Sequence, residues 1–151
     1  MKKILWILAI VATTTTAHAQ ITVTKSKKME TYSKVSALGI TRFELFRGIN
    51  GSDTTYMLTY PNNAIKGENE SFDLKASTSD MLGLEKLMIE TIKNKDSKED
   101  VTLNLGDKQY FLRRTANFGF PNLLVFHNEY DSFYISDKEI KKIFAPFHGA
   151  R

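Results

Sequence analysis

The sequence predicts an α+β protein in which an antiparallel sheet carries two helices, at about residues 79–94 and 137–145, packed on one face. Two stretches repeat apolar residues at intervals of three and four after a serine with capping-box spacing, which is typical of amphipathic helices. Most other apolar runs alternate with polar residues, as strands do. A composition of 42% hydrophobic and 25% charged residues is that of a globular domain and excludes a disordered chain.

The first residues, 1–19, predict a cleaved signal peptide. Lys2 and Lys3 form a positive start, nine apolar residues follow (ILWILAIVA), and Ala17 and Ala19 supply the small residues of a cleavage site. Nine apolar residues are too few for the roughly 20 that a membrane-spanning helix needs. We therefore expect export rather than a retained anchor.

Cleavage before Gln20 leaves a single globular α+β domain over residues 20–151, and 151 minus 19 gives about 132 residues. This length can bury a core without disulfides or metal ions, so the absence of cysteine is no obstacle to folding. Without cysteine there is no thiol for a lipid anchor. The expected location is the periplasm or the medium, with no membrane anchor after cleavage.

The charge balance argues against nucleic-acid binding. The chain has 21 Lys and Arg against 17 Asp and Glu, or +4, and the two lysines lost with the signal leave 19 against 17, or +2. A basic cluster is formed by Lys25, Lys27, Lys28 and Lys34. A solvated edge strand explains these lysines, because edge charges discourage pairing with other chains. We expect no nucleic-acid partner.

The first part of the mature chain reads as strands. Residues two apart share a face of a strand, so Phe43, Leu45 and Arg47 are expected to point inward. In a later run, Phe72 and Leu74 share one face. The expected strands are 21–25, 40–47, 55–60 and 71–76.

The helix at about 79–94 has the clearest signal. Ser77 and Asp80 have capping-box spacing, with Asp in place of the usual Glu or Gln. An apolar stripe with helical spacing follows and is expected to pack on the sheet. Its members are Met81, Leu84, Leu87, Met88 and Ile92.

The second part of the chain repeats this plan. Ser136 and Glu139 cap the helix at 137–145, Ile140, Ile143 and Phe144 give it an apolar face, and Pro146 is expected to stop it. Tyr110 and Leu112 are expected to face inward. The expected strands are 101–105, 109–115, 123–130 and 132–136.

Two weak β-rich/α halves are therefore recognisable. Residues 71–74 (SFDL) and 132–135 (SFYI) both lead into a capped helix. A duplication explains this likeness, and so does chance, because few letters match.

Motifs of common enzyme classes are absent from the sequence. It contains no G-x-S-x-G elbow, no phosphate-binding loop, no dinucleotide fingerprint and no EF-hand loop. The mature chain has no cysteine and only His127 and His148 as imidazole ligands, which disfavours zinc. We expect no cofactor and no metal.

One group of residues has the chemistry of a catalytic site. In an extended strand, His127, Glu129 and Asp131 share a face, where an imidazole and two carboxylates suit general acid–base catalysis or a weak metal site. Alternation assigns Leu124 and Phe126 to the core, together with Tyr130. The alternative is therefore that the three polar side chains lie on a solvated face.

An aromatic loop is the candidate binding site. Phe118 and Phe120 lie among turn residues, where exposed rings are candidates for contact with a partner and buried rings would cover the core. Arg113 and Arg114 are adjacent on a strand, so they must point to opposite faces. One of them is expected to pair with a buried carboxylate or to border this loop.

The function that follows is an exported, non-enzymatic binding or interaction protein. Its expected partner is an envelope or extracellular protein or a small ligand, bound through the sheet face or through the loop with Phe118 and Phe120. One alternative is a small periplasmic or secreted hydrolase that uses His127 and Glu129. Another is a structural or assembly component that self-associates through a strand edge.

Overall fold

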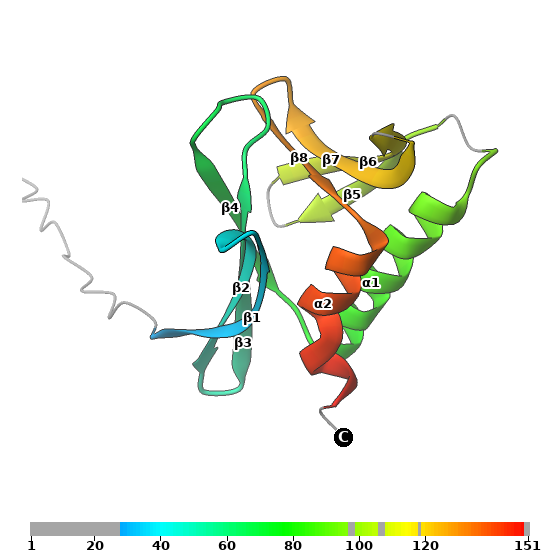
Figure 1. Cartoon of the computed structure of the whole chain (residues 1–151). Helices are drawn as coiled ribbons and strands as arrows, with labels where there is room; N and C mark the ends of the chain where they lie inside the picture. The colour runs from blue at the N-terminus through cyan, green and yellow to red at the C-terminus, as the bar shows by residue number, and fades with distance from the viewer. Residues whose placement is uncertain (1–27, 97–98, 106–107, 118, 150–151) are drawn as a thin grey trace, which may run out of the picture.

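The computed structural model describes most of the expected mature domain (Figure 1). The predicted signal peptide at 1–19 and the predicted strand at 21–25 lie outside the described residues, and both stay predictions. Within the described ranges, neither helix is long and apolar enough to cross a bilayer. The described residues are 28–96, 99–105, 108–117 and 119–149.

The chain builds the same unit twice, with four antiparallel strands followed by one helix (Figure 1). The strands of each unit pair in chain order, so each sheet is a meander. The first unit consists of β1 (Met29–Ala37), β2 (Ile40–Asn50), β3 (Asp53–Pro61), β4 (Asn69–Lys75) and α1 (Thr78–Lys93). The second unit consists of β5 (Val101–Leu105), β6 (Lys108–Asn117), β7 (Phe120–Asn128), β8 (Asp131–Ile135) and α2 (Asp137–His148).

The predicted α+β class with antiparallel strands and two helices is confirmed. One sheet was expected, whereas the strands form two four-stranded sheets because β4 and β5 do not pair with each other. Both helices lie in the angle between these sheets (Figure 1). The inner face of each sheet is therefore covered by helix as well as by the other sheet.

One apolar core fills the space between sheets and helices. Rings from the two sheets pack together in it, with centroids 4.2 Å apart for Tyr60 of β3 and Phe133 of β8, and 5.3 Å apart for Phe72 of β4 and Tyr110 of β6. Such pairs add to the stabilisation from burial. Of the inward residues predicted from alternation, Arg47 is only half-buried, with its guanidinium over the ring of Tyr32, and the apolar ones are confirmed as buried. These residues are Phe43, Leu45, Phe72, Leu74, Tyr110 and Leu112.

Each helix packs mainly against the sheet of the other unit. α1 contacts β6 and β7, and Nε of Arg114 in β6 donates to the carbonyl oxygen of Ile92 in α1 at 2.9 Å. α2 contacts β1, where Oγ of Ser33 donates to the carbonyl oxygen of Ile143 at 2.6 Å. Because the helices are exchanged in this way, each unit needs the other to cover its sheet.

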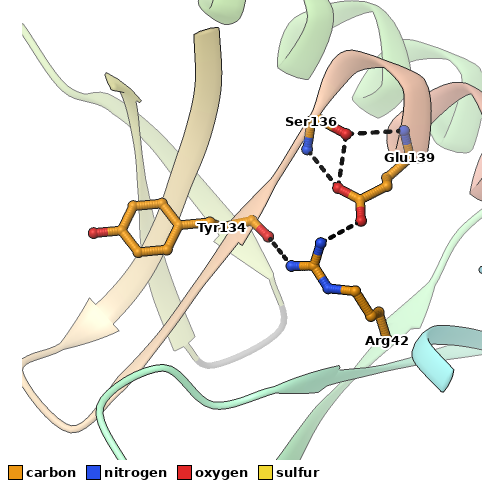
Figure 2. A network of polar contacts seen from close by, with 4 residues as sticks. All are labelled: Arg42, Tyr134, Ser136 and Glu139. Atoms are coloured by element: carbon orange, nitrogen blue, oxygen red, sulfur yellow. Dashed lines mark hydrogen bonds and ion pairs between the residues drawn. The ribbon is translucent and has the colours of Figure 1, made fainter. Parts of the chain in front are cut away.

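The beginning of α2 is bonded to the first sheet through one carboxylate (Figure 2). Glu139 accepts from the backbone nitrogen of Ser136 at 2.9 Å, and the serine hydroxyl accepts from the backbone nitrogen of Glu139, which confirms the predicted capping box. Nη1 of Arg42 in β2 donates to the other oxygen of Glu139 at 2.5 Å, and Nη2 donates to the carbonyl oxygen of Tyr134. Glu139 thus both caps α2 and joins it to β2.

The capping box predicted at the start of α1 is also present, between Ser77 and Asp80. The apolar stripe behind it is only partly core. Leu84 and Leu87 are half-buried, while the other three members of the stripe are buried. Part of this helix face therefore borders solvent.

The sequence predicts that α2 ends at Pro146. This prediction is wrong, because α2 continues to His148. The proline removes one backbone donor from the helix. Burial of Phe147, whose ring centroid lies 5.1 Å from that of Tyr32, accounts for the extra residues. Nε2 of His148 also lies 2.7 Å from Oε2 of the buried Glu85 in α1. These contacts hold the last turn in place despite the missing hydrogen bond.

β1 has no counterpart among the predicted strands. Its register with β2 shifts twice, and Val35 is its one buried hydrophobic residue, so its sequence shows no clean alternation. β1 is an edge strand, and Lys28 and Lys34 are exposed at this edge. The remaining lysines of the basic cluster, Lys25 and Lys27, lie outside the described residues.

The two units also meet through their hairpin turns. Nδ2 of the buried Asn62 donates to the carbonyl oxygen of Tyr130 at 2.7 Å, and the backbone nitrogen of Asn63 donates to the carbonyl oxygen of Ser132 at 2.8 Å. The prediction that Tyr130 lies in the core is wrong, because Tyr130 lies in the turn between β7 and β8 with its side chain exposed. Tyr130 therefore helps to join the two units through its backbone carbonyl group and not through its aromatic ring.

Candidate functional site

β7 has apolar side chains on both of its faces. Leu123 and Val125 are buried, so Leu124 and Phe126 point to the outer face of the second sheet, where they are half-buried. The prediction that Leu124 and Phe126 lie in the core is wrong. Because both faces of β7 are apolar, alternation within the strand does not show which face points to the core. Strand pairing does show it, because Val125 lies opposite the buried Leu112 of β6.

Side chains of three neighbouring strands meet on this outer face. Phe111 of β6 and Phe126 of β7 are paired residues whose rings stack at a centroid distance of 5.4 Å. Leu124 lies between its two pairing partners, Arg113 of β6 and Tyr134 of β8. We name this surface the outer aromatic face and define it by six residues. They are Phe111, Arg113, Phe120, Leu124, Phe126 and Tyr134.

Arg113 is held rigidly on the outer aromatic face. Its Nε and Nη2 donate to the two carboxylate oxygens of Asp100, both at 2.7 Å, and its guanidinium lies 5.0 Å from the ring centre of Phe126. The hydrogen bond from Arg113 lowers the pKa of Asp100, and the same bond raises the pKa of Arg113. Over half of the arginine side chain is still exposed, at 54%. A preorganised, accessible cation thus lies beside the aromatic pair.

Arg114 points the other way, as adjacent residues of a strand must. It is half-buried, and its bond to Ile92 satisfies a carbonyl group in the last turn of α1. Of the two arginines singled out in the sequence, Arg113 pairs with a carboxylate and Arg114 binds the end of a helix.

Phe120 is the most exposed ring of the outer aromatic face, at 73%. It is the first residue of β7 rather than a loop residue, and by alternation it shares its face with Leu124 and Phe126. Nδ2 of Asn122 donates to its carbonyl oxygen at 3.0 Å. Phe118, the other ring of the predicted binding loop, lies outside the described residues.

The residues of the candidate catalytic group have separate partners. Nδ1 of His127 lies 2.7 Å from the carbonyl oxygen of Gln109, while Asp131 accepts a hydrogen bond of 2.7 Å from the hydroxyl of Tyr60. Glu129 is exposed in the turn between β7 and β8. The pairing of β7 with β8 shifts register after Phe126, so the two-residue spacing of these polar side chains does not place them on one continuous strand face.

Sequence reasoning missed four members of the outer aromatic face. Phe111 and Tyr134 were left without a role, and Leu124 and Phe126 were placed in the core. One signal in the sequence could have found them. Apolar residues occupy both faces of β7, whereas a strand with one solvated face usually alternates apolar and polar residues.

The outer aromatic face offers aromatic and aliphatic side chains together with one guanidinium. Its six members include no carboxylate and no imidazole, and its one charge is engaged by Asp100. Over the part of the chain that the structure describes, no group of three or more His, Asp or Glu side chains is arranged to hold a metal ion. No family model matches the chain, and no curated protein matches it.

Proposed function

We propose that this chain is an exported, non-enzymatic binding protein that holds a partner protein on its outer aromatic face. The observation that supports this most directly is the exposed ring of Phe120, which continues along β7 into Leu124 and Phe126. The inner face of the same sheet already supplies the core. The side chains of the outer aromatic face are therefore available to contact another molecule.

The composition of this face favours a protein partner. Aromatic residues and arginine are enriched at the centres of protein interfaces and supply most of their binding energy. Arg113 is already fixed by Asp100 and by the ring of Phe126, so little side-chain entropy is lost when a partner binds. A sheet surface, unlike a flexible loop, also presents these groups in one geometry.

The partner surface that fits is apolar and weakly charged. The charges of Arg113 and Asp100 compensate each other, and the remaining members of the face are aromatic or aliphatic. A strongly charged partner would gain little there and would lose hydration. We therefore expect an envelope or extracellular protein that presents an apolar patch.

Site-specific crosslinking in the exporting cell tests this proposal. A photoreactive phenylalanine analogue replaces Phe120, and in a matched strain it replaces Ile49, an apolar residue of β2 in the other sheet that is also exposed, at 61%. We expect a discrete crosslinked protein from position 120 and not from position 49. The same products from both positions would contradict the proposal.

The captured protein is then purified and its affinity is measured by calorimetry. We expect Phe120→Ala to weaken binding at least about tenfold, as truncation of an interface anchor does. Ile49→Ala should leave the affinity within about twofold, because singly exposed apolar residues need no partner. An unchanged Kd for the Phe120 variant would remove this face from the function.

A further inference from the structure

The turn between β2 and β3 contains the sequence Asn50-Gly51. Every other asparagine of the chain is followed by a residue that has a side chain, so this is the one Asn-Gly step in the sequence. Glycine has no Cβ, which leaves its backbone nitrogen sterically open to the side chain that precedes it. At this turn a backbone nitrogen and a side-chain amide carbon are therefore adjacent without hindrance from a Cβ.

The structure places this step at the accessible end of a hairpin. Asn50 pairs with Asp53 at the end of the ladder between β2 and β3, so Gly51 and Ser52 form a two-residue turn. The backbone nitrogen of Gly51 thus lies outside the ladder. Asn50 and Gly51 are both exposed, and a Cβ at Gly51, where φ is 63°, would meet no atom within 4 Å. The turn therefore has the space that closure of a ring needs.

The side-chain amide of Asn50 forms no hydrogen bond with any of the described residues. Asn62 and Asn128 differ in this respect. Nδ2 of Asn62 donates to the carbonyl oxygen of Tyr130 at 2.7 Å, and Oδ1 of Asn128 accepts from the backbone nitrogen of Tyr130 at 2.8 Å. Those two amides must lose a hydrogen bond before they turn toward the next backbone nitrogen, whereas the amide of Asn50 turns without such a loss.

We propose that Asn50 is a deamidation site, at which the folded protein slowly converts asparagine into aspartate and isoaspartate. The backbone nitrogen of Gly51 attacks Cγ of Asn50, so that a C–N bond forms while the bond between Cγ and Nδ2 breaks. Nδ2 leaves as ammonia with the proton of the Gly51 nitrogen, and a cyclic imide remains. Water then opens this imide at either of its carbonyl carbons. Each conversion therefore consumes a water molecule and releases an ammonia molecule, and no oxidant takes part.

The two products differ in the bond that water breaks. Cleavage between the Gly51 nitrogen and Cγ gives aspartate with a normal main chain. Cleavage between the same nitrogen and the backbone carbonyl carbon of residue 50 gives isoaspartate, whose main chain runs through the former side chain and is longer by a carbon atom. The register of a hairpin depends on its turn, so the longer connection should disturb the pairing of Ile49 with Thr54.

Both products carry a new carboxylate opposite Asp53, which pairs with position 50. Like charges that lie opposite each other in paired strands are destabilising. Lys75 lines the same surface hollow as Asp53 and compensates part of this charge, but Asp80 lines the hollow as well. Conversion of Asn50 should therefore loosen this end of the first sheet. The outer aromatic face lies on the second sheet, so the two proposals stand or fall separately.

Ageing of the folded mature protein in mildly alkaline buffer tests the proposal. Samples are digested and mapped by mass spectrometry, which detects the exchange of an amide for a carboxylate as a small gain in mass. We expect this gain in the peptide with Asn50, as two products of equal mass that separate on chromatography. Conversion should be faster at higher pH, because the attacking nitrogen must lose its proton. Asn50→Gln, whose longer side chain closes such a ring less readily, should lose the change over the same period.

The peptides with Asn62 and Asn128 are internal controls and should stay unchanged over this period. A parallel sample in urea gives the reactivity of the unfolded chain. Conversion at position 50 in urea but not in the folded protein would overturn the proposal, because the fold would then protect the turn. Earlier conversion at Asn62 or Asn128 in the folded protein would overturn it as well.

The effect on stability is measured with Asn50→Asp, which reproduces one product without ageing. Its Tm should fall by up to about 4 °C at neutral pH through the like charge of Asp53, and the difference should vanish in acid as the carboxylates are protonated. Asn104→Asp is the matched control, because Asn104 is an exposed strand residue opposite the neutral Gln109. Equal losses of Tm in both variants would contradict the charge effect at the turn.

Discussion

Arg42 in β2 and Glu139 in α2 lie 97 positions apart in the sequence and form an ion pair of 2.5 Å (Figure 2). The same glutamate closes the capping box with Ser136. A local feature of helix α2 and a long-range contact with the first sheet therefore depend on one side chain. This contact fixes the start of α2 against the sheet of the other unit.

Loss of this ion pair should destabilise the fold. Arg42→Met should lower the free energy of unfolding by about 1 to 2 kcal/mol, between the values for exposed pairs and for buried charged hydrogen bonds. The matched control is Lys141→Met, which breaks the exposed pair with Asp137 within α2 and should cost at most about 0.5 kcal/mol. Urea denaturation measures both, and equal losses would refute the special role of Arg42.

Acid should weaken the contact between Asp100 and Arg113. The hydrogen bond from Arg113 holds the pKa of Asp100 below its ordinary value of 3.8, so the stabilisation is present above that pH and is lost as the pH falls through the lowered pKa. Its size is at most about 1 kcal/mol, because the arginine is half exposed. Asp100→Asn should therefore show a shallower loss of stability below about pH 4. An identical acid profile for the variant and the wild type would contradict this account.

Alkali should act through Tyr60. Burial, together with its hydrogen bond to Asp131, raises the pKa of Tyr60 above the ordinary value of 10.0. The unfolded chain then releases this proton first, so stability falls once the pH exceeds about 10. Tyr60→Phe should cost about 0.5 to 1.5 kcal/mol at neutral pH and should flatten the alkaline decline. Tyr130→Phe, at an exposed position, is the control and should leave the profile as in the wild type.

The last turn of α2 should contribute strongly to stability. Phe147→Ala removes a buried ring that packs against Tyr32 and Tyr56, and should cost about 3 to 5 kcal/mol. The same truncation at the exposed Phe120 should change stability by less than about 0.5 kcal/mol. Thermal denaturation compares the two variants directly. A small effect at Phe147 would mean that the helix effectively ends at Pro146.

The sequence by itself determined the local features of this protein. Serine capping boxes and strand alternation depend on residues a few positions apart, so Ser77, Ser136 and the inward pair Phe43 and Leu45 were predictable. At the candidate site, the opposite directions of Arg113 and Arg114 followed from strand geometry alone. Phe120 was predicted as a ring of a loop, and the structure places it in a strand.

Only the tertiary structure decided the features that depend on contacts between distant segments. Both faces of β7 carry apolar residues, so the sequence does not decide which of them is the inner face. The pairing of Val125 with Leu112 decides it. The extension of α2 past Pro146 depends on packing of Phe147 across the molecule. Likewise, the packing of each helix on the sheet of the other unit, and the separation of β4 from β5 into two sheets, depend on contacts between segments far apart in the sequence. The physical reason is that periodicity specifies which residues share a face, whereas burial against a distant partner decides which face is inside.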